Sequence, residues 1–398
     1  MRLSRSWFFF SVAAVVASST EAAQPAQKSS VTEEITVTGK RPITPETSYW
    51  VEDAFEDYPL LGPNFARGLV IWNHPDPWNH VGPSVPPIRA MEGMAALGWD
   101  IVRLQRNSRL GQGWEDKVEA VDESLGAQVN AARAEGYRHV VLAGQEVCGA
   151  FALEAGKVID GLYAIVAFAP NTGVKWGARY SSPYVPNDLN NPIILAHTWD
   201  QLTNTKAERL LVLFPAADEQ VTQARGPMAR EILAKRNLPF LLLDETSQLR
   251  GNVVADTPDF DAYASCMDLF LSPDLTPHPG EFHCGADEVP LALAQMGIKP
   301  HGGESWFGYS TRGQTIYLEL PAGGRGPVTY GWGVGANGKA KAGFRSLNAK
   351  FTGEGFTADL APDQALRGVR HGALFRLTID LEDGTRAAVA LHRLPGDS

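Results

Sequence analysis

Short apolar runs alternate with helical segments over more than half of the chain, and this alternation limits the fold more than any other feature. Runs such as Gly68–Trp72 and His139–Ala143 are almost wholly apolar. A strand that is apolar on both faces is typical of a parallel sheet, because helices cover both faces of such a sheet. The longer segments between the runs can supply crossover helices. The chain is therefore predicted to contain an α/β domain with a mostly parallel sheet flanked by helices.

This alternation predicts individual elements between Phe65 and Pro300. Strands are expected at 68–72, 100–104, 139–143, 162–168, 209–214 and 239–243, and helices at 87–97, 113–135, from 148 onward, 223–236 and 260–271. The segment 171–191 is polar and rich in Asn, Pro, Ser and Tyr. We expect it to be an insertion above the strand ends, where a lid or a substrate loop would lie.

The pattern changes after about Gly302. Short strands are expected at 315–320, 328–332, 374–379 and 387–391, and Asp383-Gly384 is a hairpin signal. Residues 301–398 are therefore predicted to form a small antiparallel β domain after the α/β domain of residues 65–300. Its aromatic residues, such as Trp306, Tyr330 and Trp332, could form a ligand platform, although such residues are more often core.

The N-terminus has the features of a signal peptide. Arg2 and Arg5 precede the apolar run Trp7–Ala17, which is too short to span a bilayer. Small residues follow, so residues 1–23 are predicted to be removed, and an uncleaved membrane anchor is the alternative. Because no later stretch is long and apolar enough to cross a bilayer, we expect an exported protein, periplasmic or secreted, with no membrane span after cleavage.

Residues 24–64 form a polar tail and a lead-in to the first domain. The tail lacks apolar periodicity up to about Tyr49 and is predicted to be disordered or extended. Within it, the segment Glu33–Arg41 resembles the TonB box at the start of outer-membrane receptors. That resemblance implies contact with a TonB protein by strand addition. A plain linker is the alternative.

The chain contains three cysteines: Cys148, Cys266 and Cys284. Export favours disulfides, and an odd number leaves one thiol unpaired. Cys266 and Cys284 lie close in sequence on either side of a Pro-rich loop, so we predict that they are paired. Cys148 lies at a predicted helix start and is expected to be buried and reduced.

The charge of the chain excludes one class of partner. The formal net charge is -10 and the pI is about 5.4, and no run is rich in Lys or Arg. Binding to nucleic acid requires a basic surface. We therefore expect no nucleic-acid partner.

The segment around Glu146 contains the candidate catalytic turn. Here a strand, the turn Gly144-Gln145-Glu146 and a helix of small residues follow one another, with Gly149 in the first helical turn. This segment resembles the nucleophile elbow of α/β-hydrolases, a strained turn usually written G-x-S-x-G. In this chain Glu146 stands in place of the serine, and Cys148 replaces the small residue that follows. The resemblance covers residues 65–272 and implies an α/β-hydrolase-like fold close to serine esterases and dienelactone hydrolases.

Other catalytic positions of the family follow in the expected order. The strand before Asp218 resembles the strand that delivers the triad acid, and Asn252 stands where the histidine is expected. His74 resembles the start of the oxyanion loop, but Pro75 replaces a glycine and has no N–H to donate. The resemblance thus implies catalytic positions at Glu146, Asp218 and Asn252. It also implies binding positions at His74 and at the neighbours of the turn, Gln145 and Val147.

These replacements favour a non-catalytic protein. A serine hydrolase needs a hydroxyl, a base and oxyanion donors, and here the hydroxyl and the base are both replaced. We therefore predict a pseudoenzyme that keeps a pocket for a small molecule or a peptide, with no cofactor.

Two alternatives remain open. The first is an unconventional hydrolase that uses Glu146 with Asp218 on an ester or a glycoside. The second is a purely structural or partner-binding role. His278, Glu281 and His283 could be considered as metal ligands, but a solvated polar loop is the better interpretation and no metal site is predicted.

Overall fold

The computed structural model describes a large part of the chain from Trp50 onward. The described residues are 50–53, 58–73, 89–104, 114–171, 192–218, 221, 224–247, 249–251, 253–283, 288–310, 314–334, 341–353, 355–362, 364–371, 374–380 and 386–394. Several sequence predictions lie outside them: the signal peptide 1–23, the TonB-like segment 33–41, most of the insertion 171–191, the Asp383-Gly384 turn, His74, Asn252 and Cys284. No helix in the described ranges is long and apolar enough to cross a membrane.

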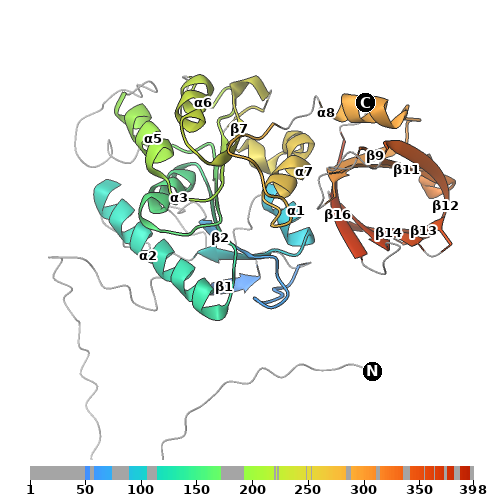
Figure 1. Ribbon diagram of the computed structural model, residues 1–398, viewed down its shortest axis with the longest axis horizontal. Helices are drawn as coiled ribbons and strands as arrows, with labels where there is room; N and C mark the ends of the chain where they lie inside the picture. Colours follow the sequence, from blue (N-terminus) through green and yellow to red (C-terminus); the bar gives the residue numbers. More distant parts are fainter. Residues whose placement is uncertain are drawn as a thin grey trace, which may run out of the picture. The chain divides into compact units, whose positions relative to one another are not determined.

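A sheet of eight strands forms the centre of the first domain (Figure 1). The strands are β1 (Trp50–Asp53), β2 (Leu69–Asn73), β3 (Asp100–Leu104), β4 (Val140–Gln145), β5 (Ala164–Phe168), β6 (Leu210–Leu213), β7 (Pro239–Leu243) and β8 (Gly280–Glu281). Their spatial order is β1-β3-β2-β4-β5-β6-β7-β8. Only β1 is antiparallel to its neighbour, and the other seven strands are parallel. This is the α/β-hydrolase-like sheet that the sequence predicted.

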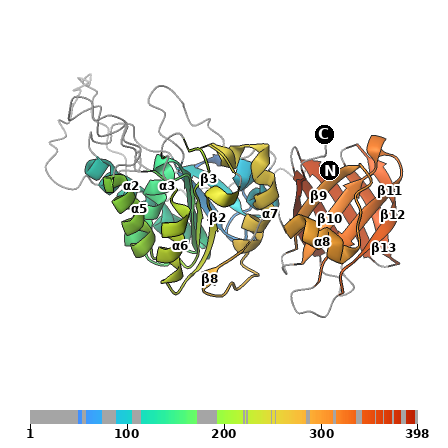
Figure 2. The same cartoon turned by 90° about the horizontal axis from the view of Figure 1, so that it is seen from above.

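Helices cover both faces of this sheet (Figure 2). They are α1 (Glu92–Ala96), α2 (Trp114–Glu135), α3 (Val147–Val158), α5 (Pro192–Asn204), α6 (Gly226–Ala234) and α7 (Asp261–Phe270). Alternate strand residues point to opposite faces. Thus Leu69 and Ile71 join a core with α2, α3, α5 and α6, whereas Val70 and Trp72 join a core with α1 and α7. Because both faces are buried, the strands are apolar throughout, as the sequence shows.

The second domain is a closed antiparallel barrel, which Figure 1 shows as a ring of strands. Its strands are β9 (Glu304–Tyr309), β10 (Thr315–Leu320), β11 (Pro327–Trp332), β12 (Gly343–Thr352), β13 (Gly355–Ala361), β14 (Gln364–His371), β15 (Leu374–Asp380) and β16 (Arg386–Arg393). Each strand pairs with the next along the chain, and β16 closes the ring by pairing with β9. Closure removes the exposed edges that an open sheet would have.

The barrel buries an interior core and carries one helix outside. Trp306 and Tyr330 belong to the interior core, and Trp332 packs against it, so these aromatics form core rather than an exposed platform. Helix α8 (Glu288–Met296) packs on outward residues of the barrel, among them Phe307 and Tyr317.

A buried hydrogen bond joins the barrel to helix α7. The His392 imidazole on β16 lies with its Nε2 3.0 Å from Oδ2 of Asp268, and both side chains are almost wholly buried. Burial raises the pKa of the Asp268 carboxyl, and the bond to His392 acts against that rise. Ala96 beside α1 also packs with Leu374 and Ala390 of the barrel. The contact between the domains is therefore part apolar and part polar.

The elements differ from the prediction in several places. The predicted strands of the α/β domain are all present, and β4 continues to Gln145, so the turn is confined to Glu146. Strands β1, β8, β9 and β12–β14 and helices α5 and α8 were not predicted. In β12 the alternation that marks a strand is broken, because Arg345 has an inward position and Phe344 lies on the exposed face.

We expect Gly144→Ala to destabilise the protein by about 2 kcal/mol, because an added Cβ would overpack the turn. That Cβ would lie 2.3 Å from the backbone oxygen of Cys148, which cannot rotate away. Urea unfolding would measure the loss. The matched control is Gly126→Ala in helix α2, where the nearest atoms lie 4.0 Å away. It should stabilise by up to about 1 kcal/mol, and equal effects of the two variants would contradict the packing argument.

Candidate functional site

Backbone strain gathers at the carboxyl ends of three adjacent strands. Among the described residues, the non-glycine residues with positive φ are Glu146, Ala169 and Ala217, with φ of 53°, 44° and 52°. They follow β4, β5 and β6, which are neighbours in the sheet. Such conformations cost on the order of 1–3 kcal/mol each and cluster at functional sites. The candidate site is therefore this end of the sheet.

Glu146 alone makes the turn between β4 and α3. Its φ of 53° and ψ of -126° lie outside the helical and extended regions. Three backbone hydrogen bonds hold it: its N–H donates to the Phe168 carbonyl (2.8 Å), and its carbonyl accepts from Ala150 (3.1 Å) and Asn171 (3.3 Å). This strained strand–turn–helix geometry is that of a nucleophile elbow. The glutamate side chain there is half-buried.

Glycines on both sides of the turn make it possible. At Gly144 a Cβ would collide with the Cys148 carbonyl, and at Gly149 it would lie 3.1 Å from the Gly144 oxygen and 3.2 Å from the Phe168 oxygen. The first turn of α3 thus lies directly on the ends of β4 and β5. This packing therefore requires a residue without a side chain at Gly144 and at Gly149.

The predicted binding positions that the structure describes surround the turn. Gln145 ends β4 and Val147 begins α3, and both are buried. Asn73, at the end of β2, donates from Nδ2 to the Cys148 carbonyl at 3.3 Å. His74, the next residue, lies outside the described residues.

Asp218, the predicted triad acid, forms a buried ion pair with Arg225. Its Oδ2 accepts from Nη2 of Arg225 at 2.6 Å, and each side chain is 1% exposed. The Val221 N–H donates to the other oxygen at 3.3 Å. The carboxylate at the acid position therefore binds a guanidinium.

The loop that carries position 252 lies next to the acid. Leu249 accepts from the Ala216 N–H at 2.7 Å, and the Gly251 N–H donates to the Ala216 carbonyl at 2.8 Å. These bonds fix the residue before Asn252 beside the strand end that leads to Asp218. Asn252 itself is outside the described residues, so its assignment to the histidine position stays a prediction.

Arg225 connects several parts of the site and was not identified from the sequence. Its Nη1 donates to the Pro170 carbonyl at 2.6 Å, next to the strained Ala169, and its guanidinium lies 4.3 Å from the centre of the Phe214 ring. Burial lowers the pKa of Arg225, and the carboxylates of Asp218 and Glu245 act against this. Arg225 follows Asp218, an expected buried acid, by only a few residues. Because buried charges are almost always paired, this spacing could have revealed it in the sequence.

Glu245 fixes the helix that follows Arg225. Its two carboxylate oxygens accept the backbone N–H groups of Arg225 and Gly226, at the start of α6. A carboxylate at a helix N-terminus stabilises the unpaired donors there. Thus Glu245, which follows β7, binds the backbone of Arg225. Pro170 and Asp218, which follow β5 and β6, bind its side chain.

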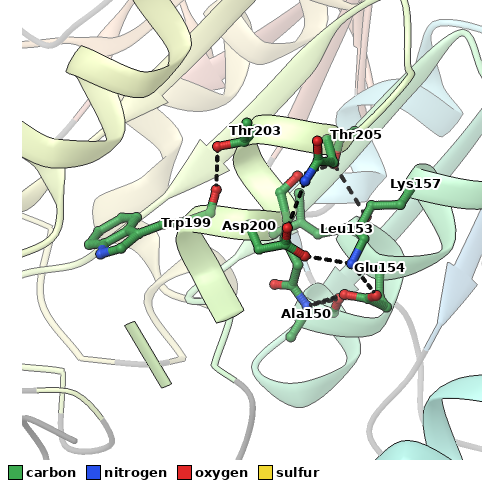
Figure 3. Close-up of polar contacts among 10 residues, drawn as sticks. Ala150, Leu153, Glu154, Lys157, Trp199, Asp200, Thr203 and Thr205 are labelled. Carbon is green, nitrogen blue, oxygen red and sulfur yellow. Dashed lines mark hydrogen bonds and ion pairs between the residues drawn. The ribbon is translucent and has the colours of Figure 1, made fainter. Parts of the chain in front are cut away.

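A polar network behind the turn holds α3 against α5 (Figure 3). The Lys157 ammonium donates to Glu154 on its own helix and to Asp200 on α5, both at 2.6 Å. Gln201 donates to the Ala150 carbonyl at 3.2 Å. Burial, and after it the Glu154 charge, raises the pKa of Asp122 to about 8. We interpret this network as support for the helix that begins at the turn.

Of the residues considered as metal ligands, Glu281 forms an ion pair. Glu281 on β8 binds the Arg230 guanidinium, with Nε to Oε2 at 2.9 Å. Arg230 also pairs with Asp244 at 2.8 Å. In the part of the chain that the structure describes, no group of three or more His, Cys, Asp or Glu side chains could hold a metal ion.

Together these features define what the site can do chemically. It combines an elbow geometry, a glutamate at the nucleophile position and an acid position occupied by an ion pair. It does not contain the hydroxyl of a serine hydrolase, because position 146 is a glutamate.

Comparisons with known proteins gave matches only among solved structures. No protein-family model and no curated protein matches the chain. The esterase Pf2001 from Pyrococcus furiosus matches with 13% identity and a TM-score of 0.37, over 58% of this chain and 95% of the esterase. Est1E from Butyrivibrio proteoclasticus has 12% identity and a TM-score of 0.37, over 56% and 97% of the chains. The sugar hydrolase YeeB from Lactococcus lactis has 14% identity and a TM-score of 0.38, over 56% and 96%.

We expect Arg225→Met to cost about 3–5 kcal/mol of stability, because it leaves the buried Asp218 carboxylate without its cation. The double variant Asp218→Asn with Arg225→Met should recover part of this loss. Chemical denaturation at neutral pH would measure both.

The matched control is Lys235→Met, which removes an exposed cation from its ion pair with Glu231. Its effect should be below about 1 kcal/mol. A loss in Arg225→Met as small as that of the control would show that the ion pair does not hold the site.

Proposed function

We propose that this chain is an exported, non-catalytic protein of α/β-hydrolase fold that binds a small molecule at the Glu146 turn. One observation carries the proposal: the acid position, Asp218, is held by Arg225 in a buried ion pair at 2.6 Å. In a triad the acid orients a histidine and stabilises its charge. Here the buried Arg225 guanidinium binds that carboxylate, and an arginine cannot act as a base at neutral pH.

The residue types at the other positions support the same conclusion. Glu146 has no hydroxyl, and Asn252, at the position assigned to the histidine, has no basic nitrogen. Losing the serine or the histidine of a triad typically costs about 10⁶-fold in kcat. A carboxylate can attack an ester, but a base must then activate water to release the product. Ordinary turnover would therefore fail at the second step.

The chemistry of the turn favours one class of ligand. The start of α3 is a site where backbone N–H groups favour an anion. Glu146 brings its own negative charge to that place, so a second anion would be repelled. We therefore propose a ligand with hydrogen-bond donors, such as a small amine or a polyol, that the glutamate side chain accepts.

The alternative is a hydrolase in which Glu146 and Asp218 act together. Such an enzyme needs both carboxylates available to protonate the leaving group or to activate water. Asp218 would first have to give up the Arg225 guanidinium, and breaking a buried pair is costly. This requirement favours the binding function.

The expected result is that purified mature protein hydrolyses neither p-nitrophenyl esters nor p-nitrophenyl glycosides above the background of Glu146→Gln. A thermal-shift panel of small amines and polyols should give stabilising ligands that Glu146→Gln loses. The control is Glu208→Gln, an exposed glutamate before β6, which should keep them. Turnover that Glu146→Gln abolishes and Glu208→Gln retains would establish the hydrolase instead.

We also propose a disulfide between Cys266 and Cys284, in keeping with export. Cys148 is buried and takes no part in a disulfide, so Cys284 is the remaining cysteine that can pair with Cys266. Peptide mapping of the unreduced protein by mass spectrometry should find the Cys266–Cys284 peptide and an N-terminus near residue 24. A bridge that includes Cys148, or a retained N-terminus, would contradict this part of the proposal.

A further inference from the structure

The inward face of the barrel follows a simple rule over most of its length. Alternate residues of each strand point inside, as strand geometry requires. The inward residues are apolar and form one core: Trp306, Ile316, Leu318, Val328, Tyr330, Leu347, Phe356, Ala358, Leu366, Phe375, Leu377, Ile379, Val389 and Leu391.

On three strands a charged residue takes an inward position at the same end of the barrel, and on β12 Arg345, which pairs with Tyr330, does so at the other end. Glu304 lies two residues before Trp306, Arg370 four residues after Leu366, and Arg393 two residues after Leu391. All three therefore have inward positions. They also contact one another: Arg370 Nη2 lies 2.7 Å from Oε1 of Glu304, and Arg393 Nε lies 3.4 Å from the same oxygen. The side chains of Glu304, Arg370 and Arg393 are 23%, 39% and 55% exposed, so these groups lie at the open end of the barrel rather than within its core.

A pocket opens where these charged groups meet the core. Its volume is about 490 Å³, and its lining residues come from the strand ends and hairpins of this end: Gly302–Glu304, Leu320–Gly324, Phe351, Gly353, Gly355, Phe356, Arg370, Phe375 and Arg393. The volume lies within the range of small-molecule pockets. Barrels of eight strands have room for one such ligand.

Aromatic rings form the apolar wall of the pocket. Phe356 and Phe375 are stacked with centroids 5.7 Å apart, and Phe351 lies 6.1 Å from Phe356. The backbone leaves space for these rings at Gly368, where a Cβ would lie 2.1 Å from Phe375 and 2.5 Å from Phe356. The wall thus suits a flat or chain-like apolar body.

The charged side chains that the structure describes in the pocket have a net positive charge. Among the lining residues in the described part of the chain, two guanidiniums face one carboxylate, a formal sum of +1. Glu304 makes two bonds to Arg370, whereas it is 3.4 Å from Arg393, whose side chain is 55% exposed. Arg393 is therefore the cation that is most accessible to a ligand, and guanidinium is well suited to bind a carboxylate.

We propose that the end of the barrel is a second ligand site, which takes a small aromatic monocarboxylate. The ring of the ligand packs on Phe351, the partly exposed ring beside the buried Phe356 and Phe375, and its carboxylate binds Arg393. Glu304 neutralises Arg370 and so sets the preference for a single negative charge. This site is independent of the Glu146 turn and does not rest on the function proposed for it.

Calorimetry with 3-phenylpropanoate and its uncharged match, 3-phenylpropan-1-ol, tests the proposal on the full mature chain. The acid should bind at least about tenfold more tightly than the alcohol, because a charge-assisted bond contributes roughly 1.5–3 kcal/mol. Arg393→Gln should remove this difference, and Phe351→Ala should weaken both compounds.

The matched control is Arg376→Gln, which removes an exposed arginine from the outward face of β15 and should leave binding unchanged. Thermal unfolding of each variant establishes that the barrel is intact. The proposal is overturned if the acid does not bind up to its solubility limit, or if Arg393→Gln binds it as wild type does. Binding that Glu146→Gln removes and Arg393→Gln retains would place the ligand at the turn and overturn the barrel site.

Discussion

The close approach of helix α3 to the ends of β4 and β5 is the constraint on which the candidate site depends. Neither Gly144 nor Gly149 has a side chain, so the backbone of the first helical turn can lie on the strand ends. The chain must then reverse within one residue, and that residue is Glu146, with φ of 53°. Backbone hydrogen bonds to the Phe168 carbonyl and from Ala150 offset the strain. The position of the glutamate is therefore fixed by packing, whatever its chemistry.

The turn has the strand–turn–helix geometry of a nucleophile elbow, and a glutamate stands at its tip. An elbow presents whichever side chain occupies its tip, and a fold does not by itself determine an activity. Here the changes are consistent with one another: a glutamate at the tip is accompanied by an arginine bound to the acid position. A buried carboxylate needs a cation beside it, and Arg225 supplies one from the start of α6.

The barrel shows a similar relation between a structural rule and its exceptions. Alternation places an apolar residue inside at nearly every inward position, which stabilises the core. Arg345 is one exception, at one end, whereas Glu304, Arg370 and Arg393 lie together at the other end, around a pocket. Departures from a packing rule that gather in space, from strands far apart in sequence, mark places where binding rather than stability has determined the residues.

The sequence by itself determined the elements whose signal is local. The apolar runs identified the parallel strands, and the glycines around Glu146 located the turn, because a strand buried on both faces and a turn without side-chain space each have a local composition. Only the tertiary structure revealed the pair of Asp218 and Arg225, the closure of β16 on β9 and the inward charges of the barrel. In the sequence, Arg370 and Arg393 look like solvated residues of amphipathic strands. Which face of a strand is inside depends on pairing with distant strands, and that information is not local.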